Sequence, residues 1–254
     1  MKIDINKVYD RLELCKRSHA PSFTDFLDLA QLIEVRKSLK MPPGYIMVEF
    51  SCFRSDERRM IGFFTNDYLD YSEEQLFLMF PVELLEIKPR FKTEPTYGHR
   101  DVLGSLLGLG IERRMFGDII INEDVGYVIC NKSISHIVSA ELLMVKRTAV
   151  NITTKIIDMQ VKLLEPKSDT ITLTLASLRI DSLVKGVCNC SRNEAISLIK
   201  AGQVKLNQIE VVKNHQSLHE GDILSVRTKG KFKLSEIGKV TKKGRISIIV
   251  FKYI

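Results

Sequence analysis

Capping residues and cations follow one another along the C-terminal third of the chain in an order that suits phosphate binding. Ser191 is placed to cap a helix, and Glu194, three residues later, would complete a capping box. Gly202 would end that helix, Val204–Leu206 would leave it as a strand, and Asn207 would begin a tight turn. The cations on this scaffold are Arg179, Lys185, Arg192, Lys200 and Lys205. Fixed cations beside helix N-terminal amides predict a surface that binds a chain of phosphates.

The positive charge of the chain is concentrated in the same region. The whole sequence has a formal net charge of +7. Residues 178–254 contain 15 Lys and Arg against 6 Asp and Glu, a net of +9, so residues 1–177 carry the remaining −2. A basic domain on a nearly neutral body is typical of nucleic-acid binders, because each phosphate contact releases counterions. A basic face that only keeps the protein in solution is the alternative interpretation.

A second group of cations lies in a glycine-rich stretch, which holds five of the chain's 14 glycines between residues 98 and 117. Its spacing, G-x-x-x-G-x-G, is neither a Walker loop nor a dinucleotide fingerprint, so we expect no nucleotide cofactor. His99 and Arg100 would open a helix, and Arg113 and Arg114 would follow its end, which predicts a second phosphate-binding patch. Exposed basic residues at helix ends are the competing interpretation. A neighbouring aspartate gives His99 a partner, but no nucleophile or third group completes a catalytic site.

The remaining reactive residues give little sign of metal or redox chemistry. The cysteines are Cys15, Cys52, Cys130, Cys188 and Cys190. They are odd in number and lack paired two-residue spacings, so we expect reduced thiols and no disulfide framework, metal or other cofactor. The sequence shows no signal pattern and no apolar run of about 18 residues, so we expect a soluble, cytoplasmic protein without a membrane partner.

The elements that would position these residues indicate an α+β protein, beginning with an N-terminal α/β segment at residues 1–74. Apolar residues recur at helical spacing from Ile5 to Cys15 and roughly continue that spacing from Phe23 to Leu39. Tyr45–Phe53 and Met60–Phe64 then suit a hairpin with a polar turn. The segment is therefore expected to contain a long helical region followed by two strands.

Residues 75–165 follow the order β-α-β-β-α-β, which predicts a middle ferredoxin-like domain, the architecture that RNA-recognition motifs also use. The expected strands are Val82–Lys88, Asp118–Asn122, Tyr127–Cys130 and Thr148–Ile157, and the expected helices are His99–Gly108 and Ser133–Val145. Ser133 would cap the second helix, and Lys146-Arg147 would follow its last turn. The third strand offers Tyr127 alone, so we do not expect bases to stack on this sheet.

Residues 166–177 read as a linker that contains a strand-like segment, Thr170–Leu175, and residues 178–254 form the last expected domain. Further cations at Lys229 and Lys231, and in the run Lys242-Lys243-Gly244-Arg245, would lie on turns between strands. They would extend the basic surface along an RNA backbone.

The order of residues in the last domain resembles the αL RNA-binding domain named after small-subunit ribosomal protein S-four. The matching motifs are R-I-D at Arg179–Asp181, S-R-N-E-A at Ser191–Ala195, I-K-A-G-Q-V-K-L-N at Ile199–Asn207 and G-D at Gly221–Asp222. The resemblance covers about Leu178 to Arg227 and departs at Gln208, where the family usually has glycine. It implies a helix pair and a turn that grip folded RNA through its phosphates.

The S-four resemblance also implies which residues contact RNA. Arg179 and Arg192 come first, followed by Lys185, Ser191, Asn193, Lys200, Gln203, Lys205 and Asn207. For two residues we favour a structural role instead: Asp181 would pair with a neighbouring cation, and Ser191 would cap its helix.

The central motif G-H-R-D-V-L-G-S-L-L-G-L-G-I-E-R-R, the following G-D-I-I and the last domain together resemble the YlmH family of bacterial proteins over nearly the full length. This resemblance implies a non-enzymatic factor that binds structured RNA, both rRNA and tRNA, on the large ribosomal subunit. Ribosome-associated quality control, the rescue of stalled translation, is the implied process, and no DNA partner is expected.

The competing interpretation is an RNA-modifying enzyme that docks through the same domain. Pseudouridine synthases and rRNA methyltransferases carry an S-four-type domain, usually at the N-terminus. In this sequence the domain is C-terminal, and no glycine loop after a strand suits a cofactor. These features favour the binding factor.

Overall fold

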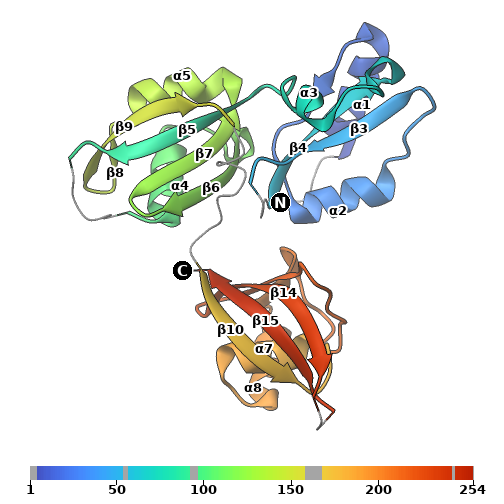
Figure 1. Ribbon diagram of the computed structural model, residues 1–254, viewed down its shortest axis with the longest axis vertical. Helices are drawn as coiled ribbons and strands as arrows, with labels where there is room; N and C mark the ends of the chain where they lie inside the picture. Colours follow the sequence, from blue (N-terminus) through green and yellow to red (C-terminus); the bar gives the residue numbers. More distant parts are fainter. Residues whose placement is uncertain (1–4, 54–56, 92–96, 158–167, 242–243, 254) are drawn as a thin grey trace. The chain divides into compact units, whose positions relative to one another are not determined.

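The computed structural model describes residues 5–53, 57–91, 97–157, 168–241 and 244–253. The chain forms two compact units, residues 1–165 and 166–254 (Figure 1). Both are mixtures of helices and antiparallel sheets, so the expected α+β class is confirmed.

The first part of the N-terminal unit is a small sheet with helices. Its elements are α1 (Ile5–Ser18), β1 (Ser22–Phe23), β2 (Leu27–Asp28), α2 (Leu29–Ser38), β3 (Tyr45–Phe50), β4 (Arg58–Thr65), η1 (Asn66–Tyr68) and α3 (Glu73–Phe77). The expected hairpin is confirmed, because β3 pairs with β4 in antiparallel register from Tyr45 opposite Thr65 to Phe50 opposite Met60.

The expected continuation of helical structure through Phe23 and Leu27 is wrong. Both residues lie in two-residue strands that pair with β4. The second helix begins only after Asp28, whose side chain accepts a hydrogen bond from the backbone N–H of Gln31 while the Gln31 side chain caps the Asp28 N–H. This capping box fixes the start of α2 at a point that apolar spacing alone does not mark.

The second part of the N-terminal unit has the predicted order of elements. They are β5 (Val82–Pro89), α4 (His99–Gly108), η2 (Arg113–Met115), β6 (Phe116–Asn122), β7 (Val125–Asn131), α5 (Lys132–Glu141), β8 (Met144–Val145) and β9 (Thr148–Lys155). The strands form one antiparallel sheet in the order β6-β7-β5-β9-β8. Two strands that are neighbours in the chain, β6 and β7, therefore form a hairpin beside β5.

Both predicted ends of helix α5 are wrong. Its N-cap is Asn131, whose side chain accepts hydrogen bonds from both the backbone N–H and the hydroxyl of Ser133. The helix ends at Glu141, and the residues beyond it form strand β8. Lys146 has a φ of +56° in the tight turn between β8 and β9, so it does not lie at the helix C-terminus.

The two faces of this sheet contribute to different cores. Leu85 and Val128 point toward helices α4 and α5 and pack with Val102 and Val138. Leu84, Ile120 and Ile129 lie in a second core with aromatic residues of the first part, among them Phe26, Phe50 and Phe64. The first 74 residues therefore cover part of the sheet face that the helices leave open.

The C-terminal unit is a six-stranded antiparallel sheet with two helices. Its elements are β10 (Ser168–Leu175), α7 (Ile180–Cys188), α8 (Arg192–Lys200), β11 (Val204–Leu206), β12 (Ile209–Glu210), β13 (Ile223–Val226), β14 (Gly230–Val240) and β15 (Ile246–Tyr253). The order across the sheet is β10-β15-β14-β13-β11-β12.

The expected linker at residues 166–177 is largely wrong, because Ser168–Leu175 forms strand β10 and pairs with β15 along its whole length. The strand-like pattern of Thr170–Leu175 explains this result, since alternate residues Ile171, Leu173 and Leu175 contribute to the core.

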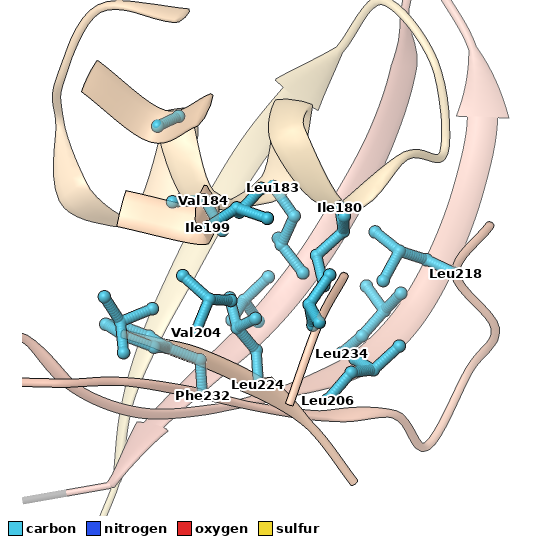
Figure 2. Close-up of a cluster of buried hydrophobic side chains, with 14 of the residues drawn as sticks. Ile180, Leu183, Val184, Ile199, Val204, Leu206, Leu218, Leu224, Phe232 and Leu234 are labelled. Carbon is cyan, nitrogen blue, oxygen red and sulfur yellow. The ribbon is translucent and has the colours of Figure 1, made fainter. Parts of the chain in front are cut away.

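Helices α7 and α8 pack on one face of the C-terminal sheet. Figure 2 shows Ile180, Leu183 and Ile199 from the helices pointing toward Val204, Leu224 and Phe232 from the strands. All six side chains are buried. This core fixes the starts of both helices relative to the sheet, and these starts carry the predicted arginines.

Candidate nucleic-acid interface

Arg179 and Arg192 meet at the carboxylate of Asp181. The Asp181 side chain is fully buried (0% exposed). Arg179 donates from Nε to Oδ1 and from Nη2 to Oδ2, both at 3.1 Å. Arg192 donates from Nε and Nη2 to Oδ2 at 3.1 and 3.0 Å. The expected pairing of Asp181 with a neighbouring cation is confirmed, and it involves both leading candidates.

The geometry leaves part of each guanidinium available to a ligand. The side chain of Arg179 is 35% exposed and that of Arg192 is 60% exposed. Each uses Nε and Nη2 on Asp181, and in the part of the chain that the structure describes no hydrogen bond involves either Nη1. A guanidinium has five N–H donors, so each arginine retains donors for an anion such as a phosphate.

The first turn of α8 already satisfies some of its own amides. The Ser191 hydroxyl accepts from the Glu194 N–H at 3.2 Å, and the Glu194 carboxylate accepts from the Ser191 N–H at 2.7 Å. The predicted capping box is therefore confirmed, and these bonds lower the pKa of Glu194. Because a carboxylate occupies the helix start, the helix amides contribute less to anion binding than the arginines.

The turn after β11 has the strained conformation that its sequence implies. Asn207 and Gln208 have φ values of +50° and +66°, as a type I′ turn requires. The Asn207 side chain accepts from the Ile223 N–H at 2.9 Å and donates to Asp222 at 2.8 Å. Asn207 thus holds the turn in place, while Gln208 occupies a conformation that glycine would adopt with less strain.

The other predicted RNA contacts divide between two sides of the sheet. Lys229 is exposed in the turn between β13 and β14, and after the Ser191 hydrogen bonds its charge also contributes to the lowered pKa of Glu194. Lys205 and Lys231 lie on strands whose neighbouring residues are buried in the core, so both point to the face opposite the helices. The residues predicted to contact RNA therefore lie on two surfaces of the C-terminal unit rather than on one.

The remaining predicted residues have simpler positions. Lys185, Asn193 and Lys200 are exposed on the two helices, while Gln203 is half-buried and its carbonyl accepts from the Arg227 N–H at 2.9 Å. Arg245 is exposed beside β15, whereas Lys242 and Lys243 lie outside the described residues.

The second predicted patch does not present four cations side by side. Arg113 donates from Nη1 to the carbonyl oxygens of Phe116 and Gly117 at 2.7 and 3.0 Å. Burial, together with the like charge of Arg58, lowers the pKa of Arg113 to about 10. Hydrogen bonds to Glu112 and Asp25 raise the pKa of Arg114.

These contacts favour the structural interpretation for two of the four residues in that patch. Arg113 and Arg114 are engaged within the N-terminal unit, whereas His99 and Arg100 are exposed at the start of α4. The phosphate-binding role of His99 and Arg100 stays a prediction.

Arg113 belongs to a polar network that no sequence motif indicates. Arg58 donates to the carbonyls of Phe116 and Phe26 at 3.1 and 2.7 Å. The Asp118 carboxylate accepts from the backbone N–H groups of Glu57 and Arg58. Burial and the nearby Glu57 raise the pKa of Asp118 to about 6. These bonds join β4 to β6, residues about 60 positions apart, so no local motif marks them.

The described residues offer no group of three or more His, Cys, Asp or Glu side chains that could hold a metal ion. All five cysteines are free, and burial raises the pKa of the Cys130 thiol to about 12. Within the described ranges no helix is long and apolar enough to cross a membrane.

Comparisons with known proteins point in the same direction as the motifs. A family model described as "Putative RNA-binding domain in YlmH" matches residues 78–159. "Ribosome-associated protein quality control protein P2" of Bacillus subtilis (strain 168) is 28% identical over 245 residues, 95% of this chain and 91% of the relative. The solved structure "Cell division protein ylmH from Streptococcus pneumoniae" is 24% identical, with a TM-score of 0.47, over 63% of this chain and 92% of that one. The family model and the Bacillus relative bear out the resemblance to YlmH proteins that the motifs indicated.

Proposed function

We propose that the chain is a non-enzymatic factor that binds rRNA and tRNA on the large ribosomal subunit and acts in the rescue of stalled translation. The name of the Bacillus relative supports a role on the ribosome, and the family model supports RNA binding. On this proposal, the protein works in the cytoplasm with RNA as its main partner and needs no cofactor.

The observation that carries the proposal is the arginine pair around Asp181. Both guanidinium groups are held by one buried carboxylate, and both remain partly exposed. Side chains held in this way lose less conformational entropy when they bind a phosphate. Within the proposed function, the C-terminal unit is an S-four-type domain and residues 75–165 form a ferredoxin-like domain. The strand order β6-β7-β5-β9, all antiparallel, supports the latter assignment.

Binding of the purified chain to bacterial large ribosomal subunits tests the proposal. Arg179→Ala and Arg192→Ala are made singly, because each variant leaves Asp181 one arginine partner. We expect each variant to bind about tenfold more weakly at moderate salt and to keep its melting temperature within a few degrees, since no core is opened. Wild-type affinity should fall steeply as salt rises. Unchanged binding in both variants, or an affinity independent of salt, would contradict phosphate-led binding.

The alternative function, an RNA-modifying enzyme, has a separate test. A clear rise in melting temperature on addition of S-adenosylmethionine would indicate a methyltransferase, because a ligand that binds only the folded state stabilises it. We expect no rise.

A further inference from the structure

The outer face of the C-terminal sheet, the side away from α7 and α8, carries cations and aromatic rings. On β14, Phe232 and Leu234 are buried in the core, so Lys231 and Lys233 point to the outer face. On β15, Ile248 and Val250 are in the core, so Phe251 and Tyr253 point outward. Two lysines and two aromatic rings therefore share one side of two paired strands.

Strand register places these four side chains next to one another. Lys231 is directly opposite Tyr253, and Lys233 is directly opposite Phe251. The Lys231 ammonium lies 5.9 Å from the centre of the Tyr253 ring, a cation–π distance. The next strands extend the same row, with Ser225 opposite Lys231 and Lys205 opposite Ser225. From Lys205 to Tyr253 the row spans about 14 Å, three strand spacings.

The centre of this face carries no acidic side chain among the described residues. The positions beyond Tyr253 and Phe251, on β10, are Ser168 and Thr170. The nearest acidic outward positions are at the borders: Glu210 is opposite Lys205 on the edge strand β12, and Glu236 follows a β-bulge in β14. Phe251 and Tyr253 are half-buried rather than covered. Among the described residues the central surface is thus positive and partly aromatic.

We propose that this outer face is a second RNA-binding surface, one that holds an unpaired segment of RNA. Bases stack on Tyr253 and Phe251, while Lys231, Lys233 and Lys205 hold the backbone between them. Unpaired RNA fits this chemistry better than a duplex, because only splayed bases offer their faces to aromatic side chains. The inference deepens the proposed function and rests on it: the arginine pair would hold folded RNA on the helix side, and the sheet would hold a single strand on the other.

Binding of the full chain to a fluorescently labelled 12-nucleotide oligoadenylate tests the inference. The main variant is Lys231→Gln with Lys233→Gln. The matched control is Lys213→Gln with Lys239→Gln, which removes the same charge at two exposed positions that the row does not include. We expect the main variant to bind about tenfold more weakly. Its log–log salt slope should be smaller by about 1.4, the value for two lost phosphate contacts on a single strand. The control should stay within about twofold of wild type.

Aromatic variants separate stacking from charge. Tyr253→Leu should bind the oligoadenylate about fivefold more weakly, whereas Tyr253→Phe, which keeps the ring, should bind like the wild type. Melting temperatures identify any variant that fails to fold, and in that case Phe251→Leu replaces Tyr253→Leu. Wild-type strength in the lysine and leucine variants, or an equal loss in the matched control, would overturn the inference. Failure of the wild type to bind the oligoadenylate would also overturn it.

Failure of this inference is distinguishable from failure of the proposed function. If Arg192→Ala weakens binding to large ribosomal subunits while the outer-face variants bind oligoadenylate normally, the function stands and the second surface does not exist. If neither set of variants affects any RNA, both proposals are wrong.

Discussion

Two arginine pairs lie near an aspartate: Arg58 and Arg113 of the N-terminal unit near the partly buried Asp118, and Arg179 and Arg192 of the C-terminal unit around the fully buried Asp181. The first pair donates to backbone carbonyls, and Phe116 alone receives a bond from each arginine. The second pair donates to the carboxylate of Asp181. The difference lies in what accepts the hydrogen bonds and where the remaining donors point.

This difference separates a structural arginine from one that is prepared for a ligand. Carbonyl oxygens surround the Arg58–Arg113 pair, and burial lowers the pKa of both residues. A single carboxylate holds the Arg179–Arg192 pair from one side, and both side chains reach the surface. Sequence cannot distinguish the two cases, because both show only arginine near aspartate.

Arg113→Ala should destabilise the N-terminal unit by about 3 kcal/mol without weakening RNA binding. The substitution removes the donor to the Gly117 carbonyl, leaves the Phe116 carbonyl with Arg58 alone, and removes a partly buried cation near Asp118. Urea unfolding measures the loss, and binding to large ribosomal subunits is measured well below the unfolding transition. Arg100→Ala, at an exposed position, is the control and should change stability by less than about 0.5 kcal/mol. A stable Arg113→Ala variant that has lost RNA affinity would reverse the assignment.

Asp118 should make the stability of the N-terminal unit fall as pH rises through about 6. Its pKa is raised in the folded state to about 6, above the ordinary value near 3.8, so the folded state favours the protonated form. The stabilisation of the folded state by protonated Asp118 is fully present below the pKa that the group has in the unfolded chain, and it is lost between about pH 4 and pH 6. Relative to wild type, Asp118→Asn should therefore gain about 2 kcal/mol between pH 4.5 and pH 7.5. Parallel pH profiles for the two proteins would show that Asp118 is not perturbed.

Asp181→Asn should weaken binding to ribosomal subunits about tenfold, or about 1.4 kcal/mol, although it removes a negative charge from a surface that binds a polyanion. The reason is orientation, since a neutral amide holds two guanidinium groups poorly. NMR relaxation measurements should show that the Nε–H groups of Arg179 and Arg192 become more mobile. Asp169→Asn, an exposed change in the same unit, is the control and should leave affinity unchanged or slightly higher. Tighter binding by Asp181→Asn would mean that Asp181 only neutralises the pair.

Gln208→Gly should stabilise the C-terminal unit by about 0.5 to 1 kcal/mol and leave RNA affinity unchanged. A φ of +66° strains the backbone of glutamine but not that of glycine. Relief of this strain in the folded state outweighs the greater conformational entropy that glycine gives the unfolded state. Thermal unfolding measures the change. A loss of RNA affinity would show that the Gln208 side chain belongs to the interface.

Some features that depend on neighbouring residues were predicted, although the local caps at Asp28 and Asn131 were missed, and features that depend on distant residues were not predicted. The capping box at Ser191 and the turn at Asn207 follow from residues within a few positions. The inward direction of Arg113 depends on carbonyls and charges brought together by β4 and β6, so spacing could not indicate it. The short strands at Phe23 and Leu27 exist only because β4 pairs with both. In the candidate site Arg179 and Arg192 were each predicted as RNA contacts, but their meeting at the Asp181 carboxylate was not.

Strand β10 affects how the C-terminal unit folds during synthesis and where a stable fragment of it must begin. Among the described strands its one partner is β15, so Ser168 is held opposite Tyr253, and the first and last described strands of the unit pair with each other. During synthesis, about 70 residues must be added after β10 before β15 exists to pair with it. Until then β10 is an exposed, unpaired strand in the nascent chain. A fragment that starts at Leu178 would lack this strand and leave one side of β15 bare. Such a fragment should aggregate, whereas one that starts at residue 166 should stay monomeric.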